Sequence, residues 1–463
     1  MSVSTATPAR SAAPAPAQAP RDARTVAAAR EALAIAFGPT DARGFAVRLW
    51  DDSVDAPAGS VSPFTLVVRR PGALRRALLP PSELSLVEAY LRDDLDAEGD
   101  LGAAGRLGDL AASRLRSPRQ LVRLVRALRV LPTDDLPSAH DVASGARRAP
   151  RLRGSAAHTR QRDAATVRHH YDVGNDFYAL WLDKRSIYSC AYFPTGTEDL
   201  DAAQEAKLEH ICRKLRLQSG EHLLDVGCGW GGLLEYAATR YGVSGVGITL
   251  SEPQAQAARE RLAAAGVGDR VRIEVRDYRD LPADWRFDKA VSVGMREHVG
   301  AARLPAYFTA VHGALRPGGL FLDHGLVRGG AAEQRGVMAW LKGRLWKRDA
   351  FIQRYVFPDG ELVPLGTLIG MAERTGLEAR DVENLREHYV RTLHHWVDRL
   401  ERAHVEAAAL VGEHTYRVWR LYMAATTLGF LSGRLTLIQT LLAKPMPDGS
   451  ASVPLSRADL YLP

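Results

Sequence analysis

Residues 222–232 place one acidic residue directly before a run of closely spaced glycines. The stretch reads His222-Leu223-Leu224-Asp225-Val226-Gly227-Cys228-Gly229-Trp230-Gly231-Gly232. Its apolar beginning predicts a buried parallel strand, and the apolar residues of 233–241 have the spacing of a helix. Glycines at such a turn let a nucleoside reach backbone N–H groups, because no Cβ holds it away. A strand-to-helix connection without a ligand has the same pattern, so the surrounding sequence must decide between the two.

The order of the acid and the glycines separates this turn from a dinucleotide-binding turn. Asp225 precedes the glycines, and the glycines lack the wider spacing of a dinucleotide fingerprint. The pattern resembles the first motif of the class I S-adenosylmethionine (SAM) methyltransferases. This resemblance implies that the cofactor is SAM.

Further strand-like segments follow the glycine-rich turn, with helical stretches between them. They are residues 243–248, 271–275, 287–293 and 320–322. This alternation predicts an α/β fold with a doubly wound, mostly parallel sheet, whose ligands bind at the carboxyl ends of the strands. We therefore expect the class I SAM methyltransferase fold, together with a smaller mixed N-terminal domain.

Several ordered stretches resemble the cyclopropane-fatty-acyl-phospholipid synthase family, whose members are SAM-dependent enzymes acting on double bonds of fatty acyl chains. These stretches are residues 170–178, 188–193, 247–251, 292–300, 354–358 and 388–393. The resemblance covers residues 165–445 strongly. Residues 45–102 resemble, less specifically, the extra N-terminal domain of longer bacterial members.

The resemblance implies transfer of a methylene group to the cis double bond of unsaturated acyl chains of membrane phospholipids, giving cyclopropane fatty acids. A related lipid methyltransferase that makes a branched methyl or methylene fatty acid is one alternative. A nucleic-acid-binding SAM methyltransferase is another, although no recognised nucleic-acid-binding signature accompanies the basic charge.

An alkene is a very poor nucleophile, so the proposed reaction needs a sulfonium held against the double bond and a site without water. Aromatic faces can stabilise the positive charge that develops on carbon. The candidates are Tyr178, Trp181, Tyr188, Tyr192 and Phe193, which could equally be core residues. A base must then remove a proton from the transferred methyl group to close the ring.

The resemblance assigns two sets of site residues and no metal ion. The SAM-binding residues are Tyr188, Ser189, Asp225, Gly227, Gly229, Gly231, Thr249, Leu250, Ser251, Gln254, Asp277 and Tyr278. Asp225 is expected to order the loop, and Asp277 and Tyr278 to lie near the adenine. The catalytic residues, expected to hold a bicarbonate ion as the base, are Cys190, Glu297, His324 and Tyr389, with a backbone contact near Leu326.

Each catalytic candidate, taken singly, also fits a purely structural role. Cys190 could be a small hydrophobic residue, and Glu297 an acid favoured at a helix start. His324 could be a hydrogen-bonded core histidine, and Tyr389 a packing residue. Their joint occurrence inside matching motifs favours the functional interpretation.

The sequence departs from the family pattern at three places. Arg296 stands where the family commonly has an aromatic residue, and Asp323 belongs to a strand end that is usually more apolar. Thr426 takes the place of a cysteine that some members carry. Since the first two flank the expected base site, they bear on the product more than on the reaction type.

Length and composition limit the classes of protein. The chain of 463 residues is long enough for about two to three domains and has 46% hydrophobic residues. No apolar run approaches the roughly 18 residues of a membrane span. The unpaired pattern of the cysteines Cys190, Cys212 and Cys228 suits a reducing cytoplasm. We expect a cytoplasmic enzyme that associates peripherally with the inner face of the membrane, and that could form a homodimer.

The basic charge is concentrated in the first part of the chain. Residues 110–168 hold 13 arginines against 4 aspartates, which suggests either attraction to an anionic surface or a solvated linker. Ser117 and Pro118 predict a helix start. In that helix we expect Leu121, Val125 and Leu128 on one face and Arg119, Arg123 and Arg126 on another. Such a helix could lie on an anionic membrane or pack on the protein.

Changes in composition predict the domain boundaries. We expect a disordered Ala/Pro-rich tail at 1–25, a small domain at 26–130 and a flexible basic linker at 131–165. The methyltransferase domain is expected at 166–445, and a C-terminal tail at 446–463. Residues 337–357 interleave basic and aromatic residues, which suits either single-stranded nucleic acid or a lipid headgroup layer; their place within the family's lipid-binding part favours lipid.

Overall fold

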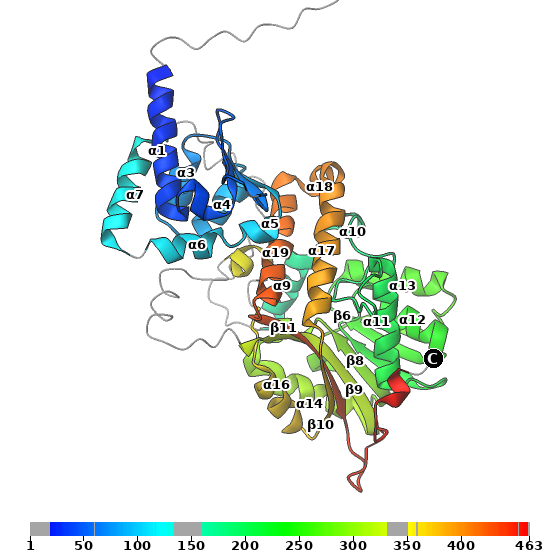
Figure 1. Cartoon of the computed structure of the whole chain (residues 1–463). Helices are drawn as coiled ribbons and strands as arrows, with labels where there is room; N and C mark the ends of the chain where they lie inside the picture. The colour runs from blue at the N-terminus through cyan, green and yellow to red at the C-terminus, as the bar shows by residue number, and fades with distance from the viewer. Residues whose placement is uncertain are drawn as a thin grey trace, which may run out of the picture. The chain divides into compact units, whose positions relative to one another are not determined.

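The computed structural model describes residues 19–59, 61–115, 117–133, 159–171, 173–330, 351–357, 360–451 and 453–461. The chain divides into two compact units, one of residues 1–144 with 341–348 and one of residues 145–340 with 349–463 (Figure 1). The first part of the predicted tail, most of the predicted linker and residues 337–350 of the basic–aromatic segment lie outside the described residues.

The first unit contains a four-stranded sheet with the order β2-β1-β3-β4, in which only β1 and β3 are parallel. The strands are β1 (Ala46–Arg48), β2 (Val54–Asp55), β3 (Phe64–Val68) and β4 (Leu95–Gly99). The helices are α1 (Ala19–Phe37), α2 (Thr40–Arg43), α3 (Ala73–Leu78), α4 (Glu83–Leu91), α5 (Leu101–Ala104), α6 (Leu107–Arg114) and α7 (Pro118–Val130). Buried Phe45 and Phe64 stack at 4.7 Å between ring centroids.

The second unit is built on a seven-stranded sheet with the order β10-β11-β9-β8-β5-β6-β7. The strands are β5 (His222–Val226), β6 (Ser244–Thr249), β7 (Val271–Val275), β8 (Phe287–Val293), β9 (Leu315–Arg328), β10 (Glu378–Asn384) and β11 (Leu435–Ala443). The five strands from β9 to β7 run parallel, and β11 lies antiparallel between β9 and β10. The predicted doubly wound, mostly parallel α/β sheet is confirmed.

Helices cover both faces of this sheet (Figure 1). The described helices of the second unit are α9 (Arg160–Tyr171), α10 (Asn175–Ala179), α11 (Leu200–Leu215), α12 (Gly232–Tyr241), α13 (Glu252–Ala264), α14 (Leu304–Ala314), α16 (Leu365–Glu373), α17 (Arg386–Arg402), α18 (His404–Val411) and α19 (Glu413–Leu431). Alternate residues of β5 show the two layers: Leu223 packs with the cluster of α11, α12 and α13, and Leu224 with the cluster of α14 and α16. Both clusters are fully buried apolar cores, which fixes the strand register.

The edge strand β10 and its neighbour β11 are absent from the strands predicted by sequence. In β10, charged residues dominate and most side chains are half-buried, because this edge strand pairs only with β11. Such a strand has neither an apolar run nor a clear alternation. Strand β11 is almost wholly buried, and a short apolar run of this kind does not by itself distinguish a strand from a buried helix.

The structure also differs from the expected segment ends. Helix α1 begins at Ala19, inside the predicted tail, and α9 begins at Arg160, inside the predicted linker. Residues after 445 pack on the second unit: Ala451 and Val453 contact its core, and Leu460 is buried. Apolar side chains docked in this way hold an otherwise irregular segment in place.

Helix α7 has the predicted cap, with Ser117 accepting a hydrogen bond from Gln120 and the Gln120 side chain reaching back. Of the expected apolar face, Leu128 is buried and Val125 is half-buried, whereas Leu121 in the first turn is exposed. Leu124 and Ala127 complete the buried face, and α7 packs on α1. In the described part of the chain, no helix combines the length and apolar content needed to cross a bilayer.

Candidate active site

A cavity opens at the carboxyl ends of β5, β6, β7 and β8, beyond the glycine-rich turn. The turn is folded against β6, where the backbone N–H groups of Gly227 and Cys228 both donate to the carbonyl of Ile248. Gly227 has a φ of +91°, and a Cβ there would lie 2.9 Å from the side chain of Met295. Glycine is therefore required at this position for both conformation and space.

Ten of the twelve predicted SAM-binding residues line this cavity. They are Tyr188, Ser189, Asp225, Gly227, Gly229, Thr249, Leu250, Gln254, Asp277 and Tyr278. Gly231 and Ser251 are not on its wall. Gly231 begins α12, where a Cβ would lie 3.0 Å from Ala258, and Ser251 caps α13 by accepting from the N–H of Gln254. These two residues position the helices that border the cavity.

The acids of the cavity have different electrostatic environments. Burial raises the pKa of Asp225 to about 7, and only Lys207 acts against this. Burial would also raise the pKa of Asp277, but hydrogen bonds from Arg279 hold it below its ordinary value. Asp277 therefore stays ionised as a hydrogen-bond acceptor at the end of β7, whereas Asp225 is more easily protonated, because burial outweighs the effect of Lys207.

The predicted catalytic residues lie beside the cavity and not on its wall. Glu297 accepts a hydrogen bond of 2.8 Å at Oε1 from the backbone N–H of Leu326, two residues after His324 on β9. His324 Nδ1 lies 3.1 Å from Nε2 of Gln439 on β11. Tyr389 interacts electrostatically with both Cys190 and Glu297. The four residues thus come from separate elements, yet belong to one buried neighbourhood.

Several buried polar atoms in this neighbourhood have no hydrogen-bond partner among the described residues, and they include Glu297 Oε2, His324 Nε2 and Gln439 Oε1. Burial raises the pKa of Glu297, although the Arg296 guanidinium acts against it. Burial, together with Lys207 and Arg296, lowers the pKa of His324 well below its ordinary value. A neutral His324 that accepts from Gln439 at Nδ1 presents an N–H at Nε2. Orphaned groups of this kind fit a small polar ligand, since buried polar atoms are normally paired.

Arg296 and Asp323, the two departures beside this neighbourhood, form a buried ion pair with each other. Arg296 also donates to the carbonyl of Leu326 at 3.1 Å, and the Tyr307 hydroxyl donates to Asp323 at 3.3 Å. The pair is therefore internally compensated and holds the end of β9.

The aromatic candidates separate into two groups. Tyr178, Trp181 and Tyr188 join Trp396 and Trp419 in a buried cluster, with Tyr178 and Tyr188 5.6 Å apart between ring centroids. Tyr192 instead stacks between His210 and His388, and Phe193 packs on His388 and His395. Of the five candidates only Tyr188 lines the cavity.

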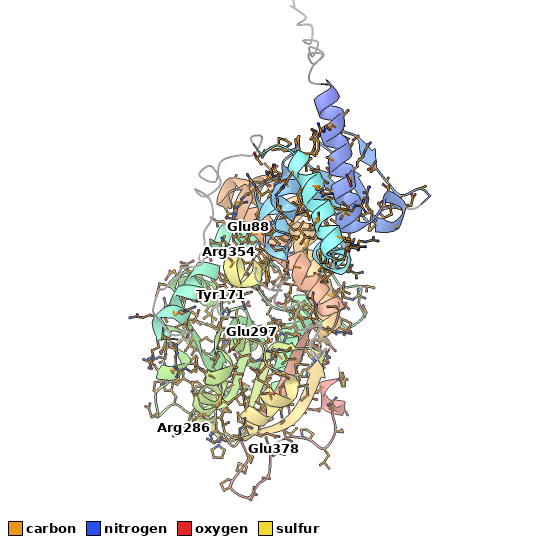
Figure 2. The ribbon with its side chains drawn as sticks, turned by 90° about the vertical axis from the view of Figure 1, so that its left-hand side faces the viewer. Glu88, Tyr171, Arg286, Glu297, Arg354 and Glu378 are labelled. Carbon is orange, nitrogen blue, oxygen red and sulfur yellow. The ribbon has the colours of Figure 1, made fainter. Side chains whose placement is uncertain are left out.

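The cavity wall also includes polar or aromatic side chains that were not expected from the sequence, namely Tyr171, Lys207, Trp230, His298, Asp163, Ser186, Arg276 and Arg279. Tyr171, Trp230 and His298 lie within quoted motifs, so their positions were a usable signal. Figure 2 shows Tyr171 and Glu297 well away from Arg286 and Glu378, which lie at the opposite end of the sheet. This arrangement places the site at the carboxyl ends of the strands.

The strand order, the glycine-rich turn and the cavity beyond it define the class I SAM-dependent methyltransferases. A family model described as mycolic acid cyclopropane synthetase matches residues 158–440. The chain belongs to this family of SAM-dependent enzymes, which includes the cyclopropane-fatty-acyl-phospholipid synthases, and SAM is its cofactor.

Individual relatives support the assignment. A probable fatty acid methyltransferase of Pseudomonas putida is 42% identical over 417 residues, 90% of this chain and 95% of that protein. The cyclopropane-fatty-acyl-phospholipid synthase of Escherichia coli K12 is 37% identical over 280 residues, 60% of this chain and 68% of that protein. The crystal structure of a mycolic acid cyclopropane synthase, CmaA1, complexed with SAH and CTAB has a TM-score of 0.56 at 33% identity and covers 61% of this chain and 98% of that one.

Proposed function

We propose that this enzyme transfers a methylene group from SAM to the cis double bond of unsaturated acyl chains in membrane phospholipids, giving cyclopropane fatty acids. The observation that carries the proposal is the pair of orphaned atoms, Glu297 Oε2 and His324 Nε2, buried beside the SAM cavity. Methyl transfer alone needs no such polar site. Loss of a proton after methyl transfer, which a ring and a branched methylene product both require, needs a base, and the orphaned atoms offer a place to hold one.

The described residues fit a small anion at this place. Cys190, Glu297, His324 and Tyr389 would hold a bicarbonate ion, which supplies the base when bound. The N–H of His324 can donate to it, and the raised pKa of Glu297 favours a protonated carboxyl that can also donate. A backbone contact from Leu326 to the bicarbonate ion was also expected. Because the N–H of Leu326 already donates to Glu297, Leu326 would instead orient the Glu297 side chain that contacts the ion.

The other residues orient the reactants and exclude water. The glycine-rich turn and Gln254 would hold the cofactor, and the SAM sulfonium supplies an electrophilic methyl group. Transfer of that methyl group to the alkene, with the thioether as the leaving group, would leave a positive charge on the neighbouring chain carbon. The faces of Tyr178 and Tyr188 would stabilise that charge in a site with little water. Loss of a proton from the transferred methyl group then closes the ring.

The product depends on which proton is lost. Loss from the new methyl group gives a cyclopropane, whereas loss from the neighbouring chain carbon gives a branched methylene of equal mass. With Glu297 and His324 holding the base on the side of the transferred methyl group, we expect the ring. Proton NMR of the extracted lipid tests this: upfield ring-methylene signals support the proposal, and vinylic methylene signals in their place contradict it.

The substrate class needs a separate measurement, because a nucleic acid is the alternative suggested by the basic charge. The purified enzyme is incubated with SAM labelled in its methyl group and with either vesicles of cis-unsaturated phospholipid or bulk RNA. We expect label in the lipid alone. A third arm with free unsaturated fatty acid determines whether the phospholipid headgroup is required, and label only in RNA would overturn the lipid assignment.

We also propose that the enzyme works on the cytoplasmic face of an anionic membrane without crossing it. In support, the exposed side of α7 carries Arg119, Arg123 and Arg126 beside exposed Leu121 and Val122. Apolar side chains among cations suit a headgroup layer. The homodimer stays a prediction that sedimentation of the purified protein would test.

A further inference from the structure

Lys207 of α11 is a buried lysine on the wall of the SAM cavity. Its side chain is only 2% exposed, and it lines the cavity together with Ser189 and Asp225. Its Nζ donates a hydrogen bond to the hydroxyl oxygen of Ser189, at 3.0 Å. An ammonium in this position is removed from water but open to whatever occupies the cavity.

Two other lysines of the second unit are buried, and both have carboxylate partners. Lys214, two turns further along α11, pairs with Glu383 and Asp381 of β10. Lys289 lies 3.6 Å from Glu221. In contrast, no carboxylate of a described residue lies within 4.0 Å of Lys207 Nζ. A buried cation without a counter-ion is unfavourable, so this site needs an anion.

The charged and titratable groups around Lys207 do not supply that anion. Asp183 and Asp225 act on it electrostatically, but neither forms an ion pair with it. Asp183 is engaged by the backbone N–H groups of Arg185 and Ile187. Cys190 is held as a thiol by burial, and His324 is neutral. Burial accordingly lowers the pKa of Lys207 to about 8.

The cavity itself suggests the missing partner. It extends from β5, where Asp225 and Lys207 lie, to Asp277 and Tyr278 after β7. With the adenine at the β7 end, the methionine part of the cofactor reaches the β5 end. That part carries one carboxylate, beside its α-ammonium group, and this carboxylate is an anion that the cofactor brings into the cavity.

We infer that Lys207 is the counter-ion of the α-carboxylate of SAM, with Ser189 orienting its ammonium group. The inference rests on SAM as the cofactor, and it does not depend on the acyl substrate or on the product.

The test uses full-length Lys207→Met protein and three ligands in calorimetric titrations: SAM, S-adenosylhomocysteine (SAH) and 5′-methylthioadenosine. SAM and SAH carry the carboxylate, whereas methylthioadenosine lacks the whole amino-acid part. We expect the dissociation constants of SAM and SAH to rise at least about tenfold, the effect of losing one charge-assisted hydrogen bond. The constant for methylthioadenosine should stay within about twofold.

Lys214→Met is the matched control, because it removes a buried ammonium from the same helix and leaves the cavity wall intact. It should not change the ratio of SAM to methylthioadenosine affinity, even where it lowers stability.

An equal loss of affinity for all three ligands in Lys207→Met would show that Lys207 has only a structural role. If Lys207→Met bound SAM more tightly and SAH with unchanged affinity, the only effect of Lys207 would be electrostatic repulsion of the sulfonium. If the affinities for all three ligands were unchanged but Lys207→Met needed more bicarbonate for turnover, the anion that pairs with Lys207 would be bicarbonate. Each of these three results overturns the inference.

Discussion

At the scale of single residues, Glu297 has one carboxylate oxygen bound to the backbone and the other orphaned. Glu297→Gln keeps an oxygen that can accept from Leu326 but removes the titratable proton. Because a positioned group in proton transfer commonly contributes 100-fold or more, we expect turnover to fall by about two orders of magnitude. SAM binding, measured by calorimetry, should change less than about twofold. Turnover within threefold of the unaltered enzyme would exclude Glu297 from the base site.

The Arg296–Asp323 pair gives a second prediction at this scale. Arg296→Met leaves the carboxylate of Asp323 buried without its cation, and burial already raises the pKa of Asp323. We expect this single change to lower the free energy of unfolding by about 3–5 kcal/mol. The double variant Arg296→Met with Asp323→Leu should recover most of the loss in urea denaturation. A single variant as stable as the double one would show that the two charges are not coupled.

At the scale of elements, helix α7 carries the proposed membrane contact. Replacing Arg119, Arg123 and Arg126 by Gln removes three positive charges, each worth about 1 kcal/mol near an anionic surface. We expect co-sedimentation with anionic vesicles to fall at least tenfold and to depend less on salt, with SAM affinity unchanged.

The matched control for α7 replaces three exposed arginines of the second unit, Arg240, Arg270 and Arg303, by Gln. It makes the same change in net charge away from α7. If both triple variants lose vesicle binding equally, the binding depends on the net charge of the protein and α7 is not the specific membrane contact.

At the scale of the whole molecule, Glu383 joins the edge strand β10 to α11. Its Oε2 atom forms a hydrogen bond of 2.7 Å with Nε2 of His210 and an ion pair with the Lys214 ammonium group. Burial alone would raise its pKa, but His210 and Lys214 lower the pKa of Glu383 to about 2. A carboxyl with a lowered folded-state pKa stabilises the fold above its unfolded-state pKa and loses that effect as the pH falls toward 2.

Glu383→Gln should therefore cost about 2–3 kcal/mol in unfolding free energy at pH 7. The stability curves of the variant and the unaltered protein should converge between about pH 4.5 and pH 2, as measured by urea denaturation across pH. Glu378→Gln on the same strand is the control, because its more exposed carboxylate pairs only with Arg380. A deficit that persists at pH 2 would point to packing and not to charge.

The sequence by itself determined what depends on local pattern. The glycine-rich turn after Asp225, the cap of α7 at Ser117 and the parallel strands each involve residues close in the chain. Their spacing therefore predicted the α/β fold and the cap. The resemblance to known families implied the SAM cofactor and most of the cavity wall. The family motifs added the catalytic candidates as a set.

Only the tertiary structure decided how distant charges meet. Arg296 stands 27 residues before Asp323, and the salt bridge between them exists because β9 returns beside the end of β8. Lys207 and Lys214 are both lysines of α11, and the sequence offers no reason to separate them. The fold places one against β10, where carboxylates pair with it, and the other against a cavity, where no carboxylate of the described chain does. The energy of a buried charge depends on its surroundings in space, and neighbours in sequence do not fix those surroundings.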